Sequence, residues 1–148
     1  MRILISNDDG YKADGIIQLA KSLSEIAEVI VVAPSENKSA ASSSLTLGKP
    51  LKPIQIEKNI YAIDGTPSDC VFMALTRILE NPPDLLVSGI NHGANLGDDV
   101  LYSGTVGAAM GGRFMNMPCL AVSITSLKPK HLETAVQVSS ELIETHLQ

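Results

Sequence analysis

The sequence has few aromatic residues and no excess of positive charge. It contains no tryptophan, two phenylalanines and three tyrosines, and 16 Asp and Glu residues outnumber 11 Lys and Arg residues. Proteins that bind nucleic acid polymers use basic residues to neutralise phosphates and aromatic residues to stack on bases, and this sequence has few of either. We therefore expect no nucleic acid polymer among the partners of this chain.

Cysteine and long apolar runs are also scarce. Cys70 and Cys119 are the only cysteines, which is too few for a disulfide framework. Each lies in an apolar segment, so we expect two buried free thiols and a reducing, cytoplasmic location. The N-terminal stretch reaches Asp8 and Asp9 too early for a signal peptide. No apolar run approaches the roughly 18 residues that span a bilayer, so no membrane partner is expected.

What the sequence does contain is the composition of a globular domain. Of its 148 residues, 45% are hydrophobic and 18% are charged, which suits a single domain with its own core. Short apolar segments predict buried strands at Arg2–Ser6, Glu28–Ala33, Asp84–Ser88 and Cys119–Ile124. Apolar residues at helical spacing predict helices that begin near Gly15, Thr66, Thr105 and Leu132 and end near Ala27, Leu79, Met115 and Leu147.

This alternation predicts a doubly wound, mostly parallel α/β sheet with helices on both faces, in one domain over residues 1–148. Ser35–Ser44 contains five serines and predicts a loop, and Leu45–Ile63 predicts a hairpin or an irregular β excursion. Thr66, a proline and Asp69 form a helix-start signal. The last helix runs into the C-terminus without a stop signal, so we expect the chain to be truncated there.

The first motif with chemical potential is Asn7–Gly10, which directly follows the first predicted strand. Ligands of open parallel sheets bind beyond the carboxyl ends of strands. Adjacent Asp8 and Asp9 repel each other unless a cation or a proton lies between them. Oxygen ligands of this kind suit Mg²⁺, Mn²⁺ or Ca²⁺. A solvated turn that caps the next helix is an equally good explanation.

Three further motifs offer groups to the same edge of the sheet. Asn91 could add a carbonyl oxygen, and His92 could be a ligand or an acid–base group, although an exposed loop imidazole is the simpler explanation. Ser39 could reach the cation through its hydroxyl, or belong to a flexible linker. Ser103–Thr105 opens a helix, where its hydroxyls and free N–H groups could bind a phosphate or simply cap the helix.

Four blocks of sequence carry a resemblance to a known family: RILISNDDG, VVAPSENKSAASSSLTL, GTPSDCV and SGINHGANLGDDVLYSGTVGAAM. They occur in order over nearly the whole chain, which resembles the stationary-phase survival protein E (SurE) family of metal-dependent nucleotidases. The resemblance implies a Rossmann-like core and hydrolysis of nucleoside monophosphates with bound Mg²⁺ or Mn²⁺. It implies metal ligation by Asp8, Asp9, Ser39 and Asn91, and phosphate binding by Asn95, Ser103, Gly104 and Thr105.

From this resemblance we expect a phosphomonoesterase of the 5'-nucleotidase type, in which metal-activated water attacks the phosphate. Asp8 is the candidate for orienting that water, although Asp9 is not excluded. The full-length family implies a homodimer or homotetramer, and its chains continue beyond this one and commonly carry an acid where Gly111 stands. An aspartyl-phosphate mechanism needs Asp-x-Asp, which adjacent acids do not provide. The alternative is a nucleotide-binding regulatory module without turnover.

Overall fold

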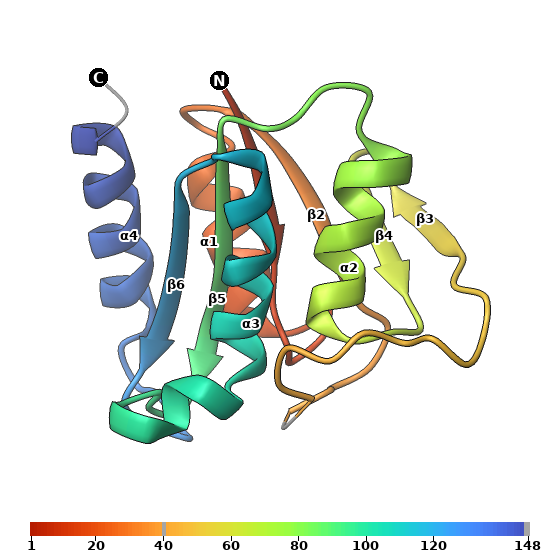
Figure 1. Ribbon diagram of the computed structural model, residues 1–148. Coiled ribbons are helices and arrows are strands. Elements are labelled where there is room, and N and C mark those ends of the chain that lie inside the picture. Colours follow the sequence, from red (N-terminus) through yellow and green to blue (C-terminus); the bar gives the residue numbers. More distant parts are fainter. Residues whose placement is uncertain (40, 147–148) are drawn as a thin grey trace.

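The structure is a computed structural model, and it describes residues 1–39 and 41–146. Six strands form one sheet in the order β3-β4-β2-β1-β5-β6 (Figure 1). Their bounds are β1 Arg2–Ser6, β2 Glu28–Pro34, β3 Pro53–Glu57, β4 Ile60–Ile63, β5 Leu85–His92 and β6 Cys119–Ile124. β3 runs antiparallel to β4, and the other pairings are parallel. The predicted mostly parallel α/β fold and the β3–β4 hairpin are thus confirmed.

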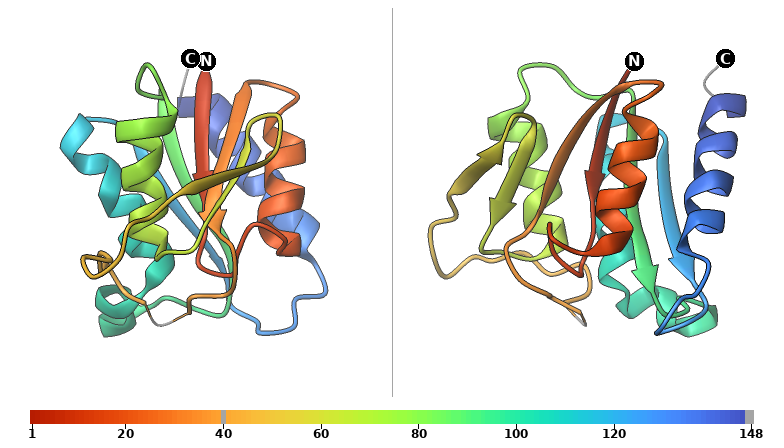
Figure 2. Two further views of the ribbon diagram at one scale, coloured as in Figure 1. Left: turned by 90° about the vertical axis from the view of Figure 1, so that its right-hand side faces the viewer. Right: turned by 180° about the vertical axis from the view of Figure 1, so that it is seen from behind.

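Helices cover both faces of the sheet. The α-helices are α1 Asp14–Leu23, α2 Pro67–Met73, α3 Gly104–Gly111 and α4 Leu132–His146, with a π turn at Ala74–Ile78 and 3-10 turns at Gly97–Tyr102 and Gly112–Met115. α1 and α4 lie on one face, and α2 and α3 lie on the other (Figures 1 and 2). Leu147, the predicted end of the last helix, lies outside the described residues. No helix within those residues is long and apolar enough to cross a membrane.

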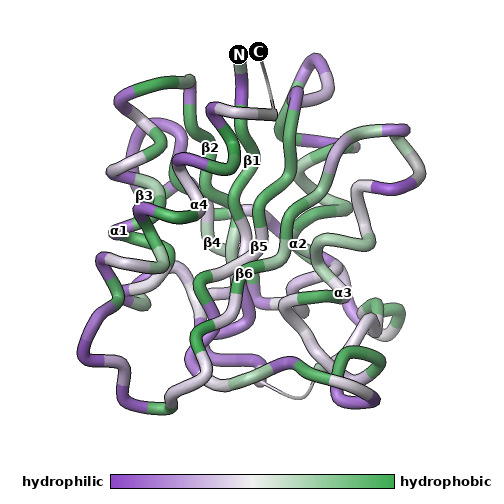
Figure 3. Tube along the Cα trace, turned by 90° about the vertical axis from the view of Figure 1, so that its left-hand side faces the viewer, coloured by the Kyte–Doolittle hydropathy of each residue, from purple (hydrophilic) through white to green (hydrophobic). Residues whose placement is uncertain are grey.

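The core has two halves because strand side chains alternate between the faces of a sheet. Ile3 and Ile5 of β1 are fully buried on the α1 side, together with Leu19. Leu4, between them in sequence, is buried on the opposite side against Val71 of α2. In Figure 3 the strands at the centre of the sheet are coloured mainly as hydrophobic. This two-sided burial explains the unbroken apolar runs of the parallel strands.

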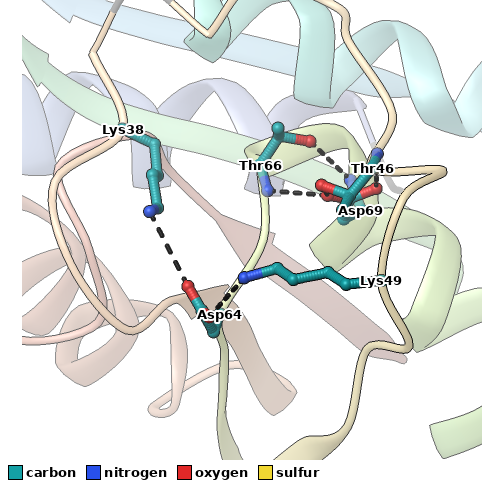
Figure 4. A network of polar contacts seen from close by, with 6 residues as sticks. All are labelled: Lys38, Thr46, Lys49, Asp64, Thr66 and Asp69. Atoms are coloured by element: carbon teal, nitrogen blue, oxygen red, sulfur yellow. Dashed lines mark hydrogen bonds and ion pairs between the residues drawn. The ribbon is translucent and has the colours of Figure 1, made fainter.

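The predicted start of α2 is confirmed as a capping box. The Thr66 hydroxyl accepts a hydrogen bond from the Asp69 backbone N–H at 3.1 Å, and the Asp69 carboxylate accepts one from the Thr66 N–H at 2.8 Å. Asp69 is 2% exposed and also accepts from the N–H and the hydroxyl of Thr46, at 2.9 and 2.6 Å (Figure 4). One buried carboxylate therefore fastens the segment after the serine-rich loop to the start of α2.

Two predictions at the other side of the sheet are wrong. β6 is the edge strand, not a buried one, and Cys119 at its start is exposed. β5 continues beyond the predicted end at Ser88 to His92, because β6 pairs with its last two residues. Strand order along the sheet decides both features, and strand order is a tertiary property.

Thiol labelling should distinguish the two cysteines. Burial, with a smaller contribution from the Asp69 charge, raises the pKa of the Cys70 thiol, so its reactive thiolate is scarce at neutral pH. We expect Ellman's reagent to modify Cys119 in the native chain and Cys70 only after unfolding. Partial burial also raises the pKa of Cys119, so its reaction should be slow. A native Cys119→Ser variant that still reacts promptly would contradict this packing of α2.

Candidate active site at the strand ends

The candidate site begins with a rigid turn at the end of β1. Asn7 is fully buried, and its side chain accepts a hydrogen bond from the Gly10 N–H at 3.1 Å and donates one to the Gly10 carbonyl at 2.9 Å. Gly10 has φ of +99°, a conformation that L side chains rarely adopt. The turn therefore fixes the backbone of Asp8 and Asp9 at the carboxyl edge of the sheet.

The start of α3 lies directly against Asp8. The buried Thr105 hydroxyl donates a hydrogen bond to Asp8 Oδ1 at 2.8 Å. A Cβ atom on Gly104 would lie 3.0 Å from Asp8 Oδ2, so glycine allows this close approach. Asp8 is 5% exposed. Its burial raises its pKa, and the charge of Asp9 raises it further, while the Thr105 hydrogen bond acts in the opposite direction.

Asp9 is linked to the serine-rich loop through Asn37. The Asn37 side-chain amide donates to Asp9 Oδ1 at 3.1 Å, and its carbonyl oxygen accepts from the Ser39 N–H at 2.8 Å. The Lys38 N–H donates to the Asp8 carbonyl oxygen at 2.7 Å. Asp9 Oδ2 is buried and has no hydrogen-bond partner among the described residues. Ser39 itself is exposed, and its hydroxyl makes no hydrogen bond to either aspartate in the described structure.

Lys38 also connects the site to a surface ion-pair group. Its ammonium group lies 3.7 Å from Asp64, which pairs with Lys49 as well (Figure 4). The hydrogen bond and charge of Lys49, followed by the charge of Lys38, lower the pKa of the Asp64 carboxyl. These pairs are solvent-exposed and therefore contribute little stability. The contacts that link this loop to the two aspartates are instead the hydrogen bonds of the Lys38 N–H and the Asn37 side chain.

The predicted residues at and just after the end of β5 occupy the same edge of the sheet, and their side chains make no hydrogen bond to Asp8 or Asp9 in the described structure. The Asn91 side-chain NH₂ donates a hydrogen bond to the Gly93 carbonyl at 3.0 Å. The side-chain oxygen of Asn91 is therefore the atom that could coordinate a cation. The Asn95 amide donates to the Ser123 hydroxyl at 2.6 Å, next to the end of β6. The expectation of an exposed imidazole at His92 is wrong. The ring is half-buried, and its Nε2 atom has no partner among the described residues.

Ser103 caps the start of α3, which is one of the two roles that the sequence predicts for it. It precedes α3 with an extended backbone, and its hydroxyl accepts a hydrogen bond from the Val106 N–H at 3.1 Å. A cap does not use all the free N–H groups of a helix start. Phosphate binding by Ser103, Gly104 and Thr105 stays a prediction, supported by the position of this helix start beside Asp8.

The donor set fits a hard divalent cation. Two adjacent aspartates stand at one strand end, where the charge of Asp9 acts on Asp8. One buried oxygen of Asp9 has no partner in the part of the chain that the structure describes. The same residues contain no group of three or more His, Cys, Asp or Glu positioned to hold a metal. A cation here would complete its shell with neutral oxygens, which Mg²⁺ and Mn²⁺ accept and which a zinc site does not favour.

The residue that the motif analysis missed is Asn37. Asn37 is not one of the four proposed metal ligands, but its side chain bonds to two of them. It accepts a hydrogen bond from the Ser39 N–H and donates one to the Asp9 carboxylate. The available signal was an asparagine two residues before Ser39. Asparagine side chains commonly accept a hydrogen bond from the backbone two residues later in a turn. The bond to Asp9 has no sequence signal, because 28 residues separate the partners.

The sequence of this chain is similar to the sequences of known proteins. The chain matches the family described as Survival protein SurE over residues 3–148. It is 63% identical over 143 residues to the 5'-nucleotidase SurE of Vesicomyosocius okutanii and 54% identical over 144 residues to that of Methylococcus capsulatus. Each alignment covers 97% of this chain and 57% of the relative. The chain thus spans less than two thirds of the length of the curated relatives it matches.

A solved structure has the same fold. The crystal structure of the SurE protein from Aquifex aeolicus superposes with a TM-score of 0.93 at 41% sequence identity. The match covers 98% of this chain and 59% of that protein. Family match, sequence identity and fold therefore agree along almost the full length of the chain, and this chain belongs to the SurE family.

Proposed function

We propose that this chain is the site-bearing part of a divalent-metal-dependent phosphomonoesterase that hydrolyses nucleoside monophosphates. The observation that carries the proposal is the contact between buried Asp8 and the start of α3, made by Thr105 and Gly104. It joins a carboxylate to a helix start, where free N–H groups and the helix dipole favour an anion. The names of the curated relatives, 5'-nucleotidase SurE, support the same reaction and substrate class.

Asp8, Asp9, Ser39 and Asn91 are the residues that would hold the cation. When bound, Mg²⁺ or Mn²⁺ would polarise a phosphate oxygen and lower the pKa of a water molecule. The buried, unpartnered oxygen of Asp9 and the remaining oxygen of Asp8 are the charged donors. Ser39 would need to turn its exposed hydroxyl inward, because that hydroxyl bonds to neither aspartate in the described structure.

The chain's own groups would position the phosphate and the water. Ser103 and the first N–H groups of α3 would stabilise charge on the phosphate oxygens. Thr105 would do the same when its single O–H, which is donated to Asp8 in this structure, turns to the phosphate. Gly104 would allow a phosphate oxygen to approach the backbone, since no side chain stands there. Asn95 would contribute an amide from the neighbouring loop. Asp8 would orient the attacking water, because its carboxylate is fixed by Thr105 and directed toward this helix start.

A phosphate-release assay tests the proposal. Nucleoside monophosphates are incubated with the chain after removal of metal by chelation, and then with added Mg²⁺ or Mn²⁺. We expect no release without metal and release after its addition. Full activity after exhaustive chelation would contradict the metal requirement. Nucleotide binding without release, under conditions in which a full-length relative is active, would favour the regulatory module instead.

Asn37 is expected to orient Asp9, and Asn37→Ser should separate this role from its role in the loop. Serine can accept the hydrogen bond from the Ser39 N–H in the same kind of turn but is too short to reach Asp9. Groups that orient metal ligands typically change metal affinity by about 10- to 100-fold. We expect Mn²⁺ affinity, measured by calorimetry, to fall about tenfold in both Asn37→Ser and Asn37→Ala. Asn81→Ala, in an exposed loop near the opposite end of the sheet, is the control. Wild-type affinity in Asn37→Ser would limit Asn37 to the loop.

Assembly and location concern the whole protein. A homodimer or homotetramer and a cytoplasmic location stay predictions from the sequence. Light scattering of this chain beside a full-length relative would show whether residues 1–148 carry any of the assembly contacts.

A further inference from the structure

A cavity lies on the α2–α3 face of the molecule. Its volume is about 440 Å³, within the range of small-molecule sites. Three separate segments form its walls: Ser43 and Leu45 at the end of the serine-rich loop, Ser68 and Phe72 of α2, and the end of α3 with the following turn. None of these residues belongs to the candidate active site.

The walls of this cavity are largely apolar. Phe72 is 56% exposed, and Leu45, Met110 and Met115 are each about half exposed. Single exposed apolar side chains are ordinary, but several that converge on one depression indicate a binding surface. Two of them are methionines, whose flexible thioethers adapt to differently shaped ligands. The cavity therefore offers apolar contact to a compact molecule.

Four polar side chains line the cavity beside the apolar ones, and two of them, Ser68 and Arg113, indicate the kind of ligand. Ser68 is 8% exposed and lines the cavity, and its hydroxyl has no hydrogen-bond partner among the described residues. A buried hydroxyl without a partner is unfavourable and is uncommon in folded proteins. Arg113 contributes a positively charged side chain to the same wall. Arg113 already takes part in an interaction within the protein, and its guanidinium carries five N–H donors, so it can contribute to the binding of a carboxylate as well.

The cavity is separated from the candidate active site by close packing. A Cβ atom on Gly107 would lie 2.7 Å from the Ser43 hydroxyl, so the serine-rich segment rests directly on the middle of α3. Met110 follows Thr105 by five residues, about 8 Å along a helix. At position 111, a Cβ atom would lie 2.9 Å from Val71 Cγ1. A larger side chain there would have to displace Val71 or occupy the cavity that Gly111 lines.

We propose that this cavity binds a small amphiphile, an apolar chain or ring with one carboxylate end. The apolar part would contact Phe72, Met110 and Met115, and the carboxylate would interact with Arg113 and the hydroxyl of Ser68. A macromolecular partner is disfavoured because the hollow is concave and of small-molecule size. This proposal does not depend on the nucleotidase function.

Methyl NMR of the intact chain tests the proposal with octanoate as the probe. Among the methionines, Met110 and Met115 line the cavity, whereas Met1 and Met117 do not. We expect saturable shifts of the Met110 and Met115 ε-methyl signals, with Met1 unchanged. Octanol has the same tail without the charge and should bind about tenfold more weakly, because a hydrogen bond to a charged group would be lost.

Substitutions locate the site and control for folding. Phe72→Gln should weaken octanoate binding about tenfold, because part of the apolar contact is lost. Leu47→Gln, at a side chain that is 92% exposed outside the cavity, is the matched control and should have no effect. Gly111→Glu should block the cavity, because the glutamate occupies it and repels the carboxylate of octanoate. Gly48→Glu adds the same charge at a position where nothing lies within 4 Å, and it is the control. If Gly111→Glu does not fold by circular dichroism, Phe72→Gln decides alone.

Several results would overturn the proposal. One is the absence of shifts at Met110 and Met115, which would mean that octanoate does not bind. Shifts of equal size at Met110, Met115 and Met1 would mean that it binds non-specifically. Another is unchanged octanoate affinity in Phe72→Gln. A third is a concentration-dependent broadening of the Met110 and Met115 signals before any octanoate is added, which would show that a second copy of the chain covers this face.

Discussion

Replacing Asp8 with asparagine is expected to slow phosphate release from nucleoside monophosphates by about a thousandfold. The cation that its charge would help to hold supplies several kcal/mol of transition-state stabilisation, and each 1.4 kcal/mol is about tenfold in rate. Asparagine has the same size and can still accept the Thr105 hydrogen bond, so the loss reports charge rather than shape. Initial rates at saturating Mn²⁺ and nucleotide measure it.

The same substitution is expected to raise the melting temperature of the metal-free protein. Burial and the neighbouring Asp9 charge raise the pKa of Asp8, which means that the ionised carboxylate is unfavourable in the folded chain. Asparagine removes that charge, so stability and activity should change in opposite directions. Asp14→Asn, at an exposed acid in the first turn of α1, is the control and should keep the wild-type rate. A wild-type rate in Asp8→Asn would exclude this carboxylate from the reaction.

Thr105→Val is expected to slow phosphate release about a hundredfold and to weaken Mn²⁺ binding about tenfold. Loss of one hydrogen-bond donor to transition-state charge typically costs on the order of 10² to 10³ in rate. The second effect belongs to the chain without substrate, in which the single O–H of Thr105 is donated to Asp8 Oδ1 and not to a phosphate. Loss of a group that orients a metal ligand typically costs about 10- to 100-fold in affinity. Valine has nearly the shape of threonine, so little cavity is created.

Two further variants separate this role from helix capping. Thr105→Ser keeps a hydroxyl and should recover most of the rate. Ser103→Ala removes the cap of α3 and should cost about 1 kcal/mol of stability. Calorimetry and melting curves on the same samples distinguish the effects. If Thr105→Val lowers only the melting temperature, its hydroxyl serves the fold and not the reaction.

The candidate active site and the proposed ligand cavity involve opposite ends of α3. Its first turn contacts Asp8 through Thr105, and its last turn lines the apolar cavity through Met110. Gly104 and Gly107 let α3 approach Asp8 and Ser43 more closely than any side chain would allow. Three of the eight residues of α3 are glycines (Gly104, Gly107 and Gly111), so its intrinsic helix propensity is low. Its contacts with α2, β5 and β6 must therefore stabilise it.

The sequence by itself determined those features that arise from neighbours along the chain. Apolar runs predicted the strands, helical spacing predicted the helices, and Thr66 with Asp69 predicted a capping box that the structure confirms. The four motif blocks identified the family, which the family match confirms. Local periodicity and capping are enough for these features, because they depend on residues only a few positions apart.

Tertiary structure decided which distant residues meet and which strand is at the edge. The contact between Asp8 and Thr105 joins residues 97 positions apart, and the bond between Asn37 and Asp9 joins residues 28 apart. No periodic pattern reports such pairs. Cys119 is exposed and His92 is half-buried because β6 lies at the sheet edge and extends the ladder of β5. Burial of a strand depends on what packs beside it in space, and that is set by the order of strands rather than by their composition.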